Sequence, residues 1–349
     1  LISRLSAIPH ELRIIFTTLF FGYIVHGFAY ANTLFGHDNT KLFSTEFSSL
    51  RWSALLFYSA RAFIQIPWVI GLIALLELGI VNVLLARLLS LRRMSSQMLL
   101  VLTVLTYPSV VAFHNYGAVD IFTGSLLLCV LAVYFYSRKG VLFTALSLLC
   151  LTVGIATYQA FVCTAAMLML AILLERLTIR HDSVKAILLS ALKAFLILVV
   201  SIALYYLVYR LLDALGLPGT TTYRGEDQMG KFALSDLPLW LLKTYVSVFR
   251  YLFGKGVQLS YIVLKYPQLF CIGVVMVFAV VRLAKEGCFK QPARVLLALL
   301  VGVRLPFAMN AIQFLNNGES PHMLMTFAYI APWLLVLQYG EWLLRKAPA

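Results

Sequence analysis

Long apolar runs, separated by short polar turns, recur along almost the whole chain. The runs Trp68–Leu85 and Ala186–Leu204 each contain at least about 18 residues with a single charged side chain, the length that a helix needs to cross about 30 Å of hydrocarbon. Lipid offers the backbone no hydrogen-bond partner, so such runs must be helical. The pattern predicts ten spanning helices, near residues 12–30, 62–86, 97–113, 118–136, 141–157, 159–175, 186–208, 266–283, 295–312 and 323–342.

The composition supports this class and excludes a soluble globular protein. Hydrophobic residues make up 62% of the 349 residues and charged residues only 12%, whereas soluble domains average about 45–50% apolar and about 25% charged residues. We therefore predict one all-α polytopic membrane domain over residues 1–349. The five cysteines lie inside or at the ends of predicted spans and show neither a disulfide pattern nor a zinc spacing. We expect no cofactor, and the sequence leaves a divalent metal open.

The distribution of Lys and Arg predicts the orientation in the membrane. The formal net charge is +14, and most basic residues lie beside the termini and the even-numbered span ends, as at Arg92, Arg180 and Lys290. The short turns on the other side, at 114–117 and 313–322, contain neither Lys nor Arg. Short loops that carry positive charge stay in the cytoplasm. We therefore expect a multi-pass inner-membrane protein with both termini in the cytoplasm.

Two long segments, 31–61 and 211–265, lie on the outer side in this topology. Their basic residues do not set the orientation, because long loops are translocated largely regardless of charge. Within the second segment, apolar residues recur at helical spacing over 237–261, which predicts an amphipathic helix in the membrane interface. The apolar residues from Phe43 to Ala54 recur in the same way and predict a second interfacial helix in the first segment.

Acids on the outer side are candidates for chemistry. Asp38 lies about eight residues beyond the first span, where a carboxylate can act as a general base towards a hydroxyl group. A capping role in a solvated turn is the alternative. Asp120 lies just inside the fourth span, where an ionisable group is costly and is a functional candidate, although the helix dipole also stabilises an acid in a first turn. Glu46 is expected on a solvated helix face, paired with Arg51.

Basic and aromatic residues near the outer side form a second group of candidates. Arg304 lies in the ninth span and His322 precedes the tenth. Cations at this rim suit a phosphate-bearing lipid head group, because Arg can bind phosphate through two hydrogen bonds. Tyr158-Gln159, at the turn between the fifth and sixth spans, supplies a donor and acceptor pair. Glu77 and Lys193 lie within or near spans, where we expect snorkelling or mutual pairing.

The order of these features resembles the bacterial membrane glucosyltransferases that modify O-antigen and other surface polysaccharides, a family of the GT-C structural class. The matching residues are His37-Asp38-Asn39, Arg51-Trp52, the stretch Tyr116–Asp120 and Ala156-Thr157-Tyr158-Gln159-Ala160. They fall in the first half of the chain, and the second half matches only in general plan. Members of that family often carry two adjacent acids in the first loop, where this chain has Asp38 followed by Asn39.

The resemblance implies transfer of a hexosyl group, most often glucose, from a polyprenyl-phosphate donor to a glycan acceptor on the periplasmic face. It places the catalytic base at Asp38. The residues that we expect to bind substrate are Arg51, Asp120, Tyr158, Gln159, Arg224, Arg304 and His322. Basic residues of the outer segments would offset the charge of the leaving phosphate. The expected partners are the lipid-linked donor, the glycan acceptor and membrane lipid, with no nucleic acid.

Two other functions are compatible with this architecture. A polysaccharide polymerase or ligase has a similar number of helices and a large outer loop, but it uses a diphosphate-linked donor. Arginine-rich outer loops favour that function, and here Arg224 and Arg250 are the only arginines well inside the second segment. A transporter or flippase would line a path through the membrane with several charged residues, and the predicted spans contain few.

We predict that Asp38, Tyr223 and His322 face the outside while Arg92 and Lys290 face the cytoplasm, because only this orientation leaves the short outer turns free of Lys and Arg. Single cysteines at these sites, probed with an impermeant thiol reagent in intact cells, test the assignment. Labelling at position 92 without labelling at position 38 would reverse it.

Overall fold

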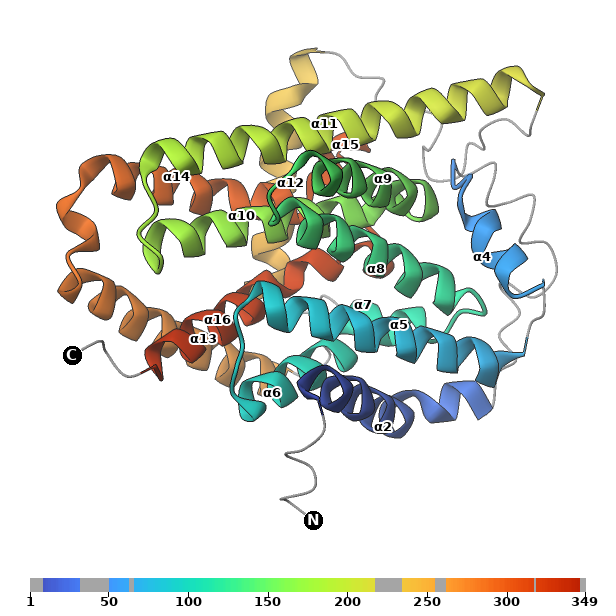
Figure 1. Cartoon of the computed structure of the whole chain (residues 1–349), viewed down its shortest axis with the longest axis horizontal. Coiled ribbons are helices and arrows are strands. Elements are labelled where there is room, and N and C mark those ends of the chain that lie inside the picture. Colours follow the sequence, from blue (N-terminus) through green and yellow to red (C-terminus); the bar gives the residue numbers. More distant parts are fainter. Residues whose placement is uncertain are drawn as a thin grey trace.

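The structure is a computed structural model that describes residues 9–31, 50–62, 66–216, 234–254, 262–316 and 318–345. Within these ranges the chain forms α-helices and short 3-10 helices and contains no β-strand. Figure 1 shows the helices packed side by side into a bundle. The all-α class predicted from the apolar pattern is confirmed.

Seven helical segments of the described chain are long and apolar enough to cross a membrane. They are α2 (His10–Ala31), α5 (Pro67–Leu88), α8 (Val119–Tyr136), η1 (Gln159–Phe161) with α10 (Val162–Thr178), α11 (Val184–Ala214), α13 (Ile262–Lys285) and α14 (Pro292–Met309). Each coincides with a predicted span. The protein is therefore an all-α polytopic membrane protein.

The other three predicted spans are shorter or interrupted. Residues 97–113 are divided between α6 (Met94–Leu105) and α7 (Pro108–Phe113), because Pro108 cannot donate to the α6 ladder and Tyr107 before it is extended. Residues 141–157 form α9 (Val141–Thr157). The last predicted span begins with η5 (Met323–Met325) and η6 (Phe327–Ile330) and only then continues as α16 (Ala331–Leu343). Apolar content locates these segments but does not reveal their breaks.

The helices α8 and α10 lie at the centre of the bundle. In the apolar stretches of α8 and of η1 with α10, 72% and 78% of the residues are buried inside the protein, against 11% in α13. α8 packs on α5, α9 and α10, and α10 also packs on α11 and α14. Large apolar side chains such as Phe195 on α11 and Phe278 on α13 are exposed. Exposed apolar surface of this extent is typical of helices that contact lipid.

Short helices lie in both long segments and near the end of the chain. The first segment contains α4 (Ala54–Ala60), the second contains η3 (Leu234–Asp236) and α12 (Leu237–Phe253), and η4 (Cys288–Lys290) and α15 (Ala311–Leu315) flank α14. The helix predicted over 237–261 is confirmed from Leu237 to Phe253 as α12, and residues 255–261 lie outside the described ranges. The helix predicted over 43–54 is wrong at its end, because Leu50 has a φ of 64° and α4 begins only at Ala54; residues 43–49 lie outside the described ranges.

Gly71 lets α2 and α5 pack closely. A Cβ atom at Gly71 would lie 2.5 Å from ring atoms of Tyr30, which is itself buried. We predict that Gly71→Ala lowers the apparent melting temperature in detergent by several degrees, since overpacking typically costs about 1–3 kcal/mol. Gly302→Ala is the matched control, because a Cβ there meets no atom within 4 Å. Equal melting temperatures for the two variants would contradict the prediction.

Candidate functional site

Residues 50–62, which we call the anchor segment, lie across the ends of several helices. We call this end of the bundle the first-loop end, because α2 ends there at Ala31 and α5 begins there at Pro67. Figure 1 shows α4, the helical part of the anchor segment, beside the ends of α5, α8 and α9. The buried side chains of the anchor segment are Leu50, Ser53, Ala54, Tyr58 and Arg61. The segment is therefore packed into the protein and does not simply rest on the membrane surface.

Ser53 fixes the start of the anchor segment to α9. Its backbone N–H donates to the carbonyl oxygen of Ala156 at 3.3 Å. Its Oγ donates to the carbonyl oxygen of Val153 at 2.9 Å and lies 2.8 Å from Oγ1 of Thr157. The last carbonyl groups of a helix have no partner within it, so these contacts supply hydrogen bonds that lipid would not.

Three predicted substrate-binding residues meet beside Ser53. The Arg51 guanidinium lies over the Tyr158 ring, 4.9 Å from its centroid, and Tyr158 is only 2% exposed. Gln159 Nε2 donates to the hydroxyl of Tyr205 on α11 at 3.2 Å. Trp52 Nε1 donates to the carbonyl oxygen of Tyr205 at 3.4 Å. The structure thus brings Arg51, Tyr158 and Gln159 together, and their contacts tie the anchor segment to η1 and α11.

The other end of the anchor segment carries a buried ion pair. Arg61 Nη1 donates to Asp120 Oδ1 at 2.8 Å, and the two side chains are 5% and 3% exposed. The guanidinium lies over the Tyr58 ring, 4.7 Å from its centroid, and Nη1 also lies 3.5 Å from the carbonyl oxygen of Gly117. Asp120 is in the first turn of α8, where the helix dipole favours negative charge. The sequence pattern does not reveal this pair, whose members are 59 positions apart.

A second acid, Glu77 on α5, contacts α8 one helical turn after Asp120. Thr123 Oγ1 donates to Oε2 of Glu77 on α5 at 2.5 Å. Gly124 allows this approach, because a Cβ there would lie 3.0 Å from Glu77 Oε1 and 2.1 Å from a ring atom of Phe57 on α4. Of the two expectations for Glu77 and Lys193, snorkelling or mutual pairing, the pairing is wrong. Lys193 Nζ donates instead to two main-chain carbonyl groups where α8 ends, at 3.1 and 3.3 Å.

Stacked histidines join α2 to the turn that precedes α8. The rings of His26 and His114 lie 3.7 Å apart and are inclined by 7°. His26 Nε2 donates to the carbonyl oxygen of Leu105 at 3.0 Å, and His114 Nδ1 donates to that of Val110 at 2.7 Å. Burial lowers the pKa of His114 to about 3, so its imidazole is neutral at neutral pH. The pair therefore joins α2 to this turn through ring stacking, without charge on His114.

Arg304 and His322 have different surroundings from the residues above. Arg304 is exposed on α14 and makes no hydrogen bond or ion pair with another residue in the described ranges. His322 precedes η5, where its Nδ1 accepts from the backbone N–H of Leu324 at 3.4 Å, and η5 packs on α7. The structure therefore places Arg304 on the surface of the bundle and gives His322 a capping contact.

Three residues of the sequence-based hypothesis lie outside the described ranges: Asp38, Glu46 and Arg224. Asp38 and Glu46 belong to the stretch between Ala31 and Leu50. Ala31 and Leu50 themselves lie at the first-loop end. Their roles stay predictions.

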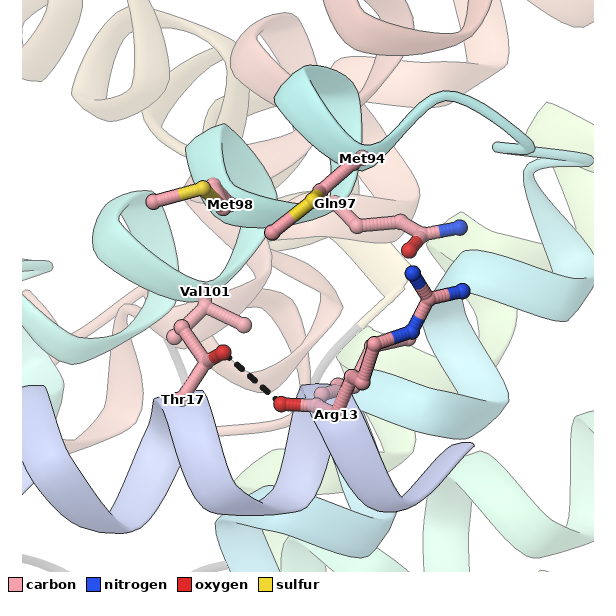
Figure 2. Close-up of a pocket in the computed structure, with 7 residues that line it drawn as sticks. Arg13, Thr17, Met94, Gln97, Met98 and Val101 are labelled. Atoms are coloured by element: carbon pink, nitrogen blue, oxygen red, sulfur yellow. Dashed lines mark hydrogen bonds between the residues drawn. The ribbon is translucent and has the colours of Figure 1, made fainter. Parts of the chain in front are cut away.

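A shallow pocket lies far from this site, between α2 and α6. Figure 2 shows its lining residues Arg13, Thr17, Met94, Gln97, Met98 and Val101. Thr17 Oγ1 donates there to the carbonyl oxygen of Arg13 at 2.7 Å. Arg13 lies in the first turn of α2, at the opposite end of that helix from Ala31. No predicted site residue lines this pocket. Arg51, Tyr158, Gln159 and Asp120 lie instead at the first-loop end, and we therefore place the candidate site there.

The first-loop end combines groups that are rare at membrane depth. Arg51 and Arg61 supply positive charge for an anionic substrate, and Asp120 and Glu77 supply carboxyl groups. Ionisable side chains in membrane segments are costly to bury and mark functional sites. Within the part of the chain that the structure describes, no three His, Cys, Asp or Glu side chains gather in a group able to hold a metal ion.

Comparison with known proteins gives one match. A family model described as Glucosyl transferase GtrII matches residues 27–333. The matched region includes the anchor segment and every residue that we predict to bind or react with substrate. No curated protein and no solved structure matches the chain.

We predict that Asp120→Asn lowers the apparent melting temperature in detergent strongly. Removing one partner of a buried ion pair leaves the other charge buried, which typically costs about 3–5 kcal/mol. Asp213→Asn is the matched control, because Asp213 pairs with Arg210 at 3.7 Å with side chains 37% and 61% exposed. Such exposed pairs are worth roughly 0.2–1 kcal/mol. A melting temperature for Asp120→Asn no lower than that for Asp213→Asn would show that the buried pair does not hold the anchor segment.

Proposed function

The chain belongs to the GtrII glucosyl transferase family, and on that premise we propose that it transfers glucose from a polyprenyl-phosphate donor to a surface glycan. Transfer takes place on the periplasmic side of the bacterial inner membrane. The family match over residues 27–333 carries this proposal, because it establishes the enzyme as a glycosyltransferase and supports a surface glycan as its acceptor. The donor, the side of the membrane and the catalytic residue are the parts that the proposal adds.

The membrane setting supports a lipid-linked donor. Such a donor keeps its isoprenoid chain in the bilayer while its phosphate and sugar lie at the surface, so its site must lie where spanning helices end. The anchor segment, with Arg51 and Arg61, is held at such an end. A soluble nucleotide sugar would need neither the apolar bundle nor a site at this depth.

In the proposed reaction an acceptor hydroxyl attacks the anomeric carbon of the donor glucose. The new bond forms between the acceptor oxygen and the anomeric carbon, while the bond from that carbon to the phosphate oxygen breaks. Asp38 takes the proton from the hydroxyl. The polyprenyl phosphate leaves with the electron pair, and the configuration at the anomeric carbon is inverted. Oriented positive charge beside the leaving phosphate is commonly the largest catalytic contribution.

The other predicted residues receive positioning or binding roles. Arg51, Tyr158 and Gln159 lie in one connected group at the first-loop end, and we assign them to the sugar and its phosphate. Arg224, Arg304 and His322 are proposed to contact the donor or the acceptor glycan. Asp120 is proposed to place substrate indirectly, through the anchor segment that it holds.

We expect Asp38→Asn to reduce turnover by roughly 10²- to 10⁴-fold, as for loss of a general base. The amide keeps the shape and hydrogen bonding of the side chain but cannot accept the proton. Donor affinity should change little, because the acid acts on the acceptor. Turnover is measured as polyprenyl phosphate released from polyprenyl-phosphate glucose.

Glu46→Gln is the matched control for Asp38→Asn, since Glu46 is the other acid of the first long segment. It should cost much less turnover. A well-folded Asp38→Asn enzyme with more than about a third of the parental turnover would remove Asp38 from the role, because general bases contribute far more than that.

A further inference from the structure

Two of the three guanidinium nitrogens of Arg61 have no partner among the residues that the structure describes. Nη1 donates to Asp120 at 2.8 Å, whereas Nε and Nη2 are both buried without a hydrogen bond to any described residue. Most buried N–H groups in proteins have a partner, so unsatisfied ones call for an explanation. Here the unsatisfied groups belong to a buried cation beside the first turn of α8, where a missing partner is costly.

The two nitrogens lie on one edge of the guanidinium. Nε and Nη2 point in parallel and match two oxygens of one phosphate or carboxylate group, which is the geometry of a bidentate contact. Asp120 occupies Nη1 and Tyr58 lies against one face of the group. The guanidinium is therefore oriented before any ligand arrives, and its remaining edge is the one suited to an oxyanion.

A purely structural role does not account for this arrangement. The ion pair with Asp120 needs one positively charged nitrogen, which Lys would also provide. The ion pair alone gives no role to the edge of the guanidinium formed by Nε and Nη2. Binding to an anion uses the whole group: Asp120 fixes the orientation, and Nε with Nη2 bind the ligand. Such fixed donors need no reorganisation when negative charge develops on a leaving group.

We propose that Arg61 binds the phosphate of the lipid-linked donor through Nε and Nη2, with Asp120 as the residue that positions its guanidinium. This inference rests on the proposed function and adds a phosphate-binding residue that the sequence pattern did not identify. It also separates the roles of the two charges of the buried pair. Arg61 contacts the substrate, whereas Asp120 acts only through Arg61.

The test measures binding of farnesyl phosphate and of farnesol to the purified full-length protein in detergent. Farnesyl phosphate carries the isoprenyl chain and phosphate without the sugar, and farnesol lacks the phosphate. Arg61→Lys keeps a positive charge that can pair with Asp120 but removes the bidentate edge. We expect farnesyl phosphate to bind at least about tenfold more weakly to Arg61→Lys, as for loss of a charge-assisted hydrogen bond. Binding of farnesol should be unchanged.

The ratio of the two affinities distinguishes phosphate recognition from damage to the fold. A variant that is merely less stable loses affinity for both ligands alike, whereas loss of phosphate recognition lowers only the affinity for farnesyl phosphate. Arg210→Lys is the matched control, because Arg210 lies on α11 with a side chain that is 61% exposed and pairs with Asp213. It should leave both affinities at the parental value.

Three results would overturn the inference. If Arg61→Lys keeps the parental preference for farnesyl phosphate over farnesol, Arg61 does not bind the phosphate, and the proposed donor is unaffected. If Arg304→Lys loses that preference while Arg61→Lys keeps it, the phosphate lies at Arg304. If the parent protein shows no preference for farnesyl phosphate, or prefers farnesyl diphosphate, the monophosphate donor itself is wrong and the inference fails with it.

Discussion

A charge buried among membrane helices must find its partner inside the protein, and the Arg61–Asp120 ion pair meets this requirement at the first-loop end. The pair fixes the end of the anchor segment to the first turn of α8, while Ser53 fixes its start to the last turn of α9. Both attachments satisfy polar groups that lipid would leave without partners. The anchor segment is therefore attached to the bundle near both of its ends.

Attachment at both ends suits the proposed transfer from a lipid-linked sugar. Catalytic and binding groups are most effective when the supporting structure holds them before substrate binds. Close packing of α4 on α8 depends on Gly124, where a side chain would collide with Phe57. The packing of α5 on α8 brings Glu77 to Thr123. Charge, hydroxyl groups and aromatic rings are thus concentrated where the helices end, which is the depth at which a lipid-linked phosphate would enter.

The apolar pattern predicts the class of this fold well, because the hydrocarbon requires long apolar helices wherever the chain crosses it. It does not predict where helices break. Pro108 divides one predicted span, and 3-10 turns open the last one. In both cases apolar residues flank a short break, so hydropathy averaged over the length of a span does not reveal it.

The site could be predicted only in part, for a related reason. Tyr158 and Gln159, which the family pattern singled out, lie in one connected group with Arg51 in the structure, and their roles stay predictions. The sequence pattern did not single out Arg61, because the feature that distinguishes it is its ion pair with Asp120 on another helix. Charge counts alone do not show which residues face each other. The sequence pattern singled out Arg304 as a cation within a span near the outer rim, and the structure places it on an exposed face of α14.

The class of donor is the most direct test of the whole account. The purified protein in proteoliposomes would be given glucose linked to polyprenyl phosphate, to polyprenyl diphosphate or to a nucleotide, together with the glycan acceptor. We expect glucose transfer only from the monophosphate-linked donor, with one polyprenyl phosphate released for each glucose transferred. Transfer from the diphosphate- or nucleotide-linked sugar, with none from the monophosphate-linked one, would contradict the account.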